Sequence, residues 1–200
     1  MKNIVLASKS IDRSEIIQRT KIPFTVIAPN IDEKKYKNKI SDPIKLVREL
    51  ARAKAIDIKE MLNKRNQEAL IIAADTIVER TGKIIGKAEN EIQAFQILKN
   101  LINKSHNLIT GIAITETNNP KLIIDHDCTV VNFIYLSDNE IWNYIKTNEW
   151  KGRAGAYSLR DKASLFIESI EGSSSNVIGL PMHKIFKIIK SEFNLNLFEL

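Results

Sequence analysis

The stretch IIAADTIVERTGKIIGK, residues 71–87, constrains the fold of this chain more than any other part of the sequence. It is typical of two buried strands, yet a carboxylate, Asp75, stands in the middle and a lysine, Lys87, at the end. Burying an ionised carboxylate costs several kcal/mol unless the group is paired, metal-bound or protonated. Any fold for this chain must therefore bring a compensating partner to Asp75.

The register of these two strands decides whether Lys87 is that partner. Period-2 alternation places Asp75 on the same face as Ala73 and Ile77. A three-residue hairpin loop at 80–82 sets Asp75 directly across from Lys87, whereas a two-residue loop moves Lys87 to the other face. We predict the first register. The pair is then either a structural cross-strand ion pair, worth about 0.2–1 kcal/mol, or a carboxylate base or metal ligand beside a phosphate-binding lysine.

A second anomaly is Lys54, which lies on the apolar stripe of a predicted helix. Asp42 is the expected N-cap of that helix and Pro43 its first residue. The stripe follows helical spacing through Val47, Ala51, Lys54 and Ile58. Taken alone, a lysine at such a position is explained by snorkelling of its ammonium group to solvent along the aliphatic stem. A functional cation is the alternative.

The segment LASKSIDR, residues 6–13, runs from a predicted strand into a helix N-terminus with Ser8, Ser10 and Arg13 beside it. Helix N-termini present free amides and a positive dipole end, so they bind anions readily. The segment lacks the glycine-rich signature of a P-loop, and serine is also a common structural cap.

Glu33 follows Asp32 in a predicted polar loop at 30–42 and adds a carboxylate that suits Mg²⁺, although a plain surface loop also explains it.

Composition narrows the class of protein. Two hundred residues suit one domain, and 44% hydrophobic with 27% charged residues is typical of a soluble globular protein. The sequence has no apolar run of about 18 residues and no secretory signal, so we expect a cytoplasmic protein. Cys128 is the only cysteine, which excludes an internal disulfide. The net charge of +6 suits a polyanionic ligand, nucleic acid or merely a solvated basic surface; no RNA-binding signature favours nucleic acid.

The remaining patterns mix strands and helices. We predict strands at 4–8 and 24–29, the pair within 71–87, and a hairpin of 106–117 with 121–136. Helices are predicted at 10–20, from 42, at 90–102 with a stripe of Ile92, Phe95, Leu98 and Leu101, at 137–146 and at 182–193. The mixture indicates an α/β or α+β fold with a mixed sheet. His106, His126 and His183 show no spacing typical of a zinc site, and we interpret them as structural.

An ordered set of motifs resembles one known family. LASKSIDRSEII at the start, IDE at 31–33, ELARAKA at 49–55 and AADTIVERTGKIIGKAENEIQAFQIL from 73 resemble its L-A-S-x-S-P-R-R-x-E-L-L, D-E, L-A-x-x-K-A and D-T-x-V…G-x-x-x-G-K-P blocks. HNLITGIAI, GRAGAY, FIESIEG and NVIGLP follow in the family's order. On these motifs the chain is identified as a member of the Maf, or septum-formation-inhibitor-like, family of nucleoside triphosphate pyrophosphatases over nearly its whole length.

The resemblance implies a fold and a reaction. The fold would be one Maf-like domain over 1–200, a twisted mixed sheet flanked by helices, with two lobes and a central cleft as in Maf and ITPase-like proteins. The reaction would be hydrolysis of a nucleoside triphosphate to monophosphate and pyrophosphate with Mg²⁺ or Mn²⁺, by a homodimer that acts on no nucleic acid or membrane. Clearance of noncanonical nucleotides is one expected role. The alternative is a non-catalytic nucleotide-binding regulator of septum formation.

The resemblance also implies roles for single residues. Asp75 would accept the proton of the attacking water, with Glu33 and Lys87 as further catalytic residues and Glu33 and Asp75 as metal ligands. The residues implied in substrate binding are Ser8, Asp12, Arg13, Lys54, Thr76 and Arg160. Thr76 fits the branch that acts on dTTP and UTP. Asp12 and Arg160 depart from that branch, because they stand where it has arginine and glutamine, and Ala88 replaces the usual proline.

Overall fold

The computed structural model describes residues 3–200. The chain forms two compact units. Unit 1 comprises Met1–Asp75, Thr110–Asp127 and Gly179–Leu200, and unit 2 comprises Thr76–Ile109 and Cys128–Ile178. Within the described residues, no helix is both long and apolar enough to cross a membrane.

The strands of residues 3–200 form one seven-stranded mixed sheet. Strand β1 (Ile4–Ala7) pairs in parallel with β2 (Thr25–Ile27) and β3 (Leu70–Arg80), and β5 (Ser105–Glu116) and β6 (Leu122–Phe133) follow in the sheet. Two short strands are antiparallel to their neighbours: β4 (Lys83–Ile85) to β3 and β7 (Ile167–Glu171) to β6. The predicted mixed α/β sheet is therefore confirmed.

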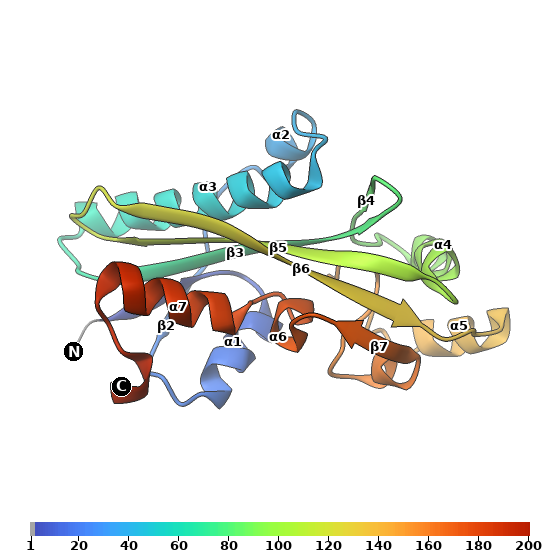
Figure 1. Ribbon diagram of the computed structural model, residues 1–200. Coiled ribbons are helices and arrows are strands. Elements are labelled where there is room, and N and C mark those ends of the chain that lie inside the picture. The colour runs from blue at the N-terminus through green and yellow to red at the C-terminus, as the bar shows by residue number, and fades with distance from the viewer. Residues whose placement is uncertain (1–2) are drawn as a thin grey trace. The chain divides into compact units, whose positions relative to one another are not determined.

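Helices cover both faces of the strands in unit 1 (Figure 1). Helices α1 (Ile11–Arg19) and α7 (Met182–Phe193) pack on the face that carries Leu6 and Ile72, and α3 (Pro43–Lys64) packs on the face that carries Val5 and Ile71. A short helix, α2 (Glu33–Lys37), precedes α3, and a 3-10 turn, η2 (Leu197–Glu199), follows α7. Because strand residues alternate between faces, both sets of β1 and β3 side chains are buried.

Helix α3 begins as its sequence predicts. The Asp42 side chain accepts from the Lys45 amide at 2.6 Å, and Pro43 is the first helical residue. The helix backbone lies against β5 at Gly111, where an added Cβ would stand 2.3 Å from the Val47 carbonyl carbon. Only glycine permits this approach, and it fixes the depth at which α3 presents its buried side chains.

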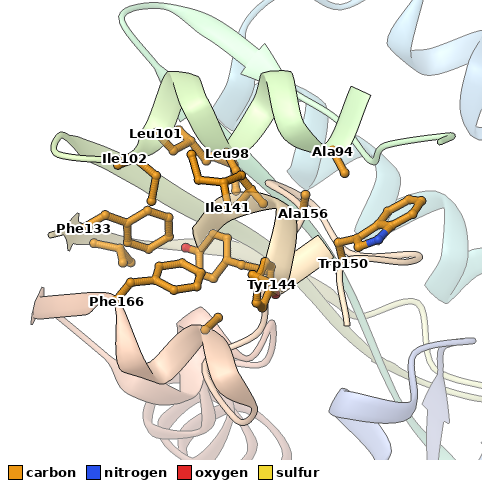
Figure 2. Packing of buried hydrophobic residues seen from close by; sticks show 14 of the residues in the cluster. Ala94, Leu98, Leu101, Ile102, Phe133, Ile141, Tyr144, Trp150, Ala156 and Phe166 are labelled. Carbon is orange, nitrogen blue, oxygen red and sulfur yellow. The ribbon is translucent and has the colours of Figure 1, made fainter. Parts of the chain in front are cut away.

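Unit 2 has its own core, built around α4 (Glu91–Leu101) and α5 (Asp138–Ile145). Figure 2 shows Leu98 and Leu101 of α4 on one side of this core and the aromatic rings of Phe133, Phe166 and Tyr144, the last from α5, on the other. The turn η1 (Lys162–Leu165) and the short helix α6 (Ser174–Val177) complete this unit. The predicted α4 stripe is wrong at one position: Ile92 is 65% exposed, and Ala94 takes its place in the core.

Two local expectations are corrected by the structure. Arg80 pairs with Lys83, so the β3–β4 loop has two residues, Thr81 and Gly82, both with positive φ. That is the geometry of a two-residue hairpin turn, and in this register Lys87 does not face Asp75. The predicted polar loop at 30–42 also contains a helix, because Asp32 caps the Lys34 amide at 3.0 Å and starts α2 at Glu33.

Candidate active site

The partner of the buried Asp75 is Lys54. Asp75 is 7% exposed on β3, and its Oδ1 accepts from Lys54 Nζ at 2.5 Å. The same Lys54 nitrogen lies 2.8 Å from Glu33 Oε1. Lys54 is itself buried, so the snorkelling interpretation is wrong: one ammonium group compensates two carboxylates inside unit 1. We call Glu33, Lys54 and Asp75 the carboxylate–lysine cluster.

Glu33 stands at the edge of this cluster, as the first residue of α2. Burial alone raises the pKa of Glu33, but the charge and hydrogen bond of Lys54, with smaller effects of Lys37, outweigh it and lower the pKa to about 2. Lys37 Nζ contacts the second oxygen, Oε2, at 3.0 Å. Glu33 is therefore an anion over the whole physiological pH range.

Arg13 adds a second buried cation to unit 1. Its Nε donates to the Gly179 carbonyl oxygen at 2.7 Å, and its Nη1 donates to Ser8 Oγ at 3.4 Å. Burial lowers the pKa of the guanidinium, and the charges of Asp75, Glu33 and Asp12 act in the opposite direction. Ser8 is buried at the entrance of α1, where its Oγ also accepts from the Ser10 amide. The positive charge of Arg13 thus interacts with both carboxylates of the cluster.

The other predicted site residues belong to unit 2, apart from the half-buried Asp12 in the first turn of α1. Thr76 follows Asp75 on β3. Lys87 is exposed and forms an isolated β-bridge with Ala154, in the segment that leads to Arg160. Within this unit, Lys87 is thus tied to the 153–161 loop.

The loop that carries Arg160 is held by several contacts inside unit 2. Tyr157 OH and His106 Nε2 lie 2.8 Å apart, and both side chains are buried. Burial, assisted by the charge of Arg80, lowers the pKa of His106 to about 4, so the imidazole is neutral near pH 7. Arg153 pairs with Asp161 at 2.9 Å. Positive φ angles at Gly155 and Ala156 set the turn between them.

Two positioning contacts were not expected from the sequence. Asp57, one turn after Lys54 on α3, accepts from the Asn30 amide at 2.8 Å and ties the segment before Glu33 to that helix. The Gly179 carbonyl oxygen holds Arg13 from the far end of the chain. No local sequence pattern predicts either contact, because Asp57 and Gly179 each bind a residue that is distant in the sequence.

Comparison with known proteins shows the family of this chain. The model of the family described as Maf-like protein matches residues 3–192. This chain belongs to the Maf-like protein family. Among its relatives, a protein of Alkaliphilus oremlandii named dTTP/UTP pyrophosphatase is 42% identical over 197 residues, 98% of this chain and 100% of that protein. A Clostridium perfringens protein of the same name is 37% identical over 188 residues, 94% of this chain and 96% of that protein.

Among solved structures, a crystal structure from Mycobacterium abscessus, titled nucleoside-triphosphatase / dITP/XTP pyrophosphatase, covers 66% of this chain and 72% of its own, with a TM-score of 0.35 and 10% identity. The carboxylate–lysine cluster, with Arg13 beside it, offers two carboxylates for a divalent ion or a water and two buried cations suited to phosphates.

Proposed function

We propose that this Maf-like protein hydrolyses nucleoside triphosphates between the α and β phosphates, releasing the monophosphate and pyrophosphate, with dTTP and UTP as preferred substrates. The names of the relatives support the reaction and the bases. The observation that carries the proposal is the buried Asp75, held 2.5 Å from Lys54, which in turn lies 2.8 Å from Glu33. A fold has little reason to bury such a group for stability, since apolar residues of similar volume serve a core as well.

Each member of the site has a role in this proposal. Asp75 accepts the proton of the attacking water, because a fixed carboxylate within reach of a water is a general base. Lys54, Arg13 and Lys87 neutralise the phosphates, and Ser8 contributes at the α1 entrance. Phosphoryl transfer depends mainly on such positioning and charge stabilisation. Asp12, Thr76 and Arg160 are the proposed contacts to the nucleoside.

The residues also fit a divalent ion. Glu33 and Asp75 each place one oxygen on a single cation, the Lys54 ammonium, so their donors already converge on positive charge. Mg²⁺ is usually held by one or two carboxylates and completed by substrate phosphates and waters, and no third His, Cys, Asp or Glu joins them among residues 3–200. Glu33 and Asp75 would hold Mg²⁺ or Mn²⁺, and the ion would supply charge neutralisation on the phosphates.

The decisive experiment is a substrate panel. The purified protein is incubated with Mg²⁺ or Mn²⁺ and each common triphosphate, together with modified nucleotides such as dITP, and pyrophosphate is measured. We expect release of pyrophosphate, fastest with dTTP and UTP. Binding without release from any member of the panel would instead assign the protein a regulatory role. Light scattering on the same preparation tests the expected homodimer.

Base preference has its own test at Arg160, which stands where the pyrimidine branch has glutamine. We expect Arg160→Gln to change the ranking of kcat/KM among bases more than it changes the best rate, because a residue at the base affects discrimination first. The neighbouring Lys162→Gln is the matched control. An unchanged ranking would remove Arg160 from base recognition.

A further inference from the structure

The most informative feature of the cluster is that a lysine already fills the space between its two carboxylates. Lys54 Nζ is within 2.8 Å of an oxygen of Glu33 and an oxygen of Asp75. The Lys54 side chain is 8% exposed and that of Asp75 is 10% exposed. The ammonium group is therefore enclosed by its partners, unlike a flexible surface lysine.

The charges of the two carboxylates are balanced by Lys54 and Arg13 together, without any further ion. Two carboxylates face Lys54, and Arg13 lies close enough for its positive charge to interact with both Asp75 and Glu33. A divalent ion that entered alone would meet two buried cations, Lys54 and Arg13, in a poorly hydrated space, where like charges repel strongly. A divalent ion that entered with a triphosphate would bring the negative charge that Lys54 and Arg13 can accept.

We propose that the Lys54 ammonium occupies the divalent-ion position in the nucleotide-free protein and moves to the phosphates when a metal–nucleotide complex binds, so that the metal enters with its substrate and not before it. This inference rests on the proposed function and adds an order of binding to it. Lys54 then has two successive partners: the carboxylates first, which keeps Asp75 and Glu33 compensated, and the phosphates second.

The test is the affinity of the nucleotide-free, full-length protein for Mn²⁺ alone, read as the loss of the electron paramagnetic resonance signal of free Mn²⁺. We expect weak binding by the wild type and binding about tenfold tighter or more by Lys54→Met, because that change leaves two neighbouring carboxylates without their cation. Lys54→Gln, which retains polar contacts, is measured in parallel in case the methionine variant does not fold, and circular dichroism monitors both.

Lys37→Met is the matched control. Lys37 contacts the other oxygen of Glu33 at 3.0 Å, but its side chain is 46% exposed and it does not bridge to Asp75. The control removes the same unit of charge beside the same carboxylate without vacating the position between the two carboxylates. We expect its Mn²⁺ affinity to stay within about threefold of the wild type, because exposed pairs are weak and screened.

A second measurement adds the non-hydrolysable analogue α,β-imido-dUTP. We expect the wild type to bind Mn²⁺ tightly in its presence and the advantage of Lys54→Met to disappear, since the variant lacks the lysine that should contact the phosphates. Tight Mn²⁺ binding by the nucleotide-free wild type, no gain in either Lys54 variant, or an equal gain in Lys37→Met would each overturn the inference.

Pyrophosphate release from dTTP or UTP is a separate readout. An active enzyme whose Lys54 variants show no gain in Mn²⁺ affinity contradicts the order of binding and leaves the proposed function intact. A protein that shows the gain but hydrolyses nothing contradicts the proposed function, whereas the exchange of Lys54 for a metal would still stand.

Discussion

Strand β3 carries two buried carboxylates that are held in different ways. Asp75, at the end of its unit 1 portion, is bound by a lysine that it shares with Glu33. Glu79, in its unit 2 portion, is bound by neutral donors: the Gly82 amide at 2.5 Å and the Asn107 side-chain amide at 2.7 Å. The two residues are 7% and 9% exposed, so burial alone does not distinguish them.

The kind of partner distinguishes a carboxylate that can take part in a functional site from one that only stabilises the fold. A backbone amide in a tight turn cannot leave, so Glu79 is fixed and serves to hold the Thr81–Gly82 turn. A lysine side chain is flexible and carries a full charge, which makes it exchangeable for another cation. We therefore expect Asp75 to serve chemistry and Glu79 to serve structure, and the same isosteric change at each residue should have opposite consequences.

The largest expected effect is that of Asp75→Asn on turnover. Removing a general base costs roughly 10²–10⁴-fold in rate, and we expect kcat to fall by about 10³-fold. The midpoint of thermal unfolding should change little, because Glu33 still compensates Lys54. Pyrophosphate release and a melting curve on one preparation measure both quantities, and near-normal turnover would return Asp75 to a purely structural role.

The next largest effect concerns the pH range in which a buried ionisable group of each unit loses its contribution to stability. The pKa of His106 in unit 2 is about 4, against 6.5 for the free side chain, because of burial and the charge of Arg80. As pH falls through 6.5, His106 becomes protonated in the unfolded chain but stays neutral in the folded protein. The free energy of unfolding therefore declines by about 3 kcal/mol until about pH 4.

Glu33 in unit 1 titrates in another range. Its pKa is held at about 2, against 4.5 for the free side chain, so the stability that it contributes is fully present above that ordinary pKa and is lost as pH falls from there through about 2. Urea unfolding at pH 7 and pH 4.5 measures the decline in unfolding free energy that is expected from His106. His106→Gln should flatten the decline over this interval, and an unchanged slope would show that His106 is not its cause.

A smaller effect is expected from Gly111→Ala, which acts on unit 1 through helix α3. The added Cβ would meet the Val47 backbone at 2.3 Å, so the helix that carries Lys54 has to shift. We expect a loss of about 1–3 kcal/mol in unfolding free energy together with reduced activity. Gly86→Ala is the control, because a Cβ there meets nothing within 4 Å, and equal losses in both variants would argue against the close approach.

The smallest effect should be that of Glu79→Gln. Replacing a charged acceptor by an amide weakens two hydrogen bonds, and we expect a loss of about 1–2 kcal/mol in unfolding free energy. Turnover should stay within about twofold of the wild type. Chemical denaturation and the pyrophosphate assay measure the two outcomes. A fall in activity as deep as that of Asp75→Asn would abolish the distinction between the carboxylates.

Much of the fold was readable from local signals. The helix that begins after Asp42 and the last helix, Met182–Phe193, start where their caps or patterns predict. The register of the hairpin after β3 could not be predicted from local signals. It depends on Thr81 adopting a φ of 51°, which is rare for a β-branched residue. A sequence pattern gives no sign that a threonine will accept this conformation.

The candidate site divides in the same way. Asp75 was found because a carboxylate contradicts an apolar strand, and its burial is confirmed. The strand pattern predicts Lys87 as its partner, whereas the structure shows Lys54 in that place. A lysine on an apolar stripe looks the same in sequence whether it reaches solvent or a buried acid, since the acid comes from a distant strand. The roles of the individual residues remain predictions.

The hydrogen bond from Arg13 to the Gly179 carbonyl joins positions 166 residues apart. A growing chain on the ribosome carries Arg13 long before Gly179, so it cannot seat that side chain until the intervening residues have been added. A product of interrupted translation would thus hold the proposed catalytic carboxylate without a properly placed arginine. The cell would be spared an unfinished hydrolase loose among its nucleotide pool.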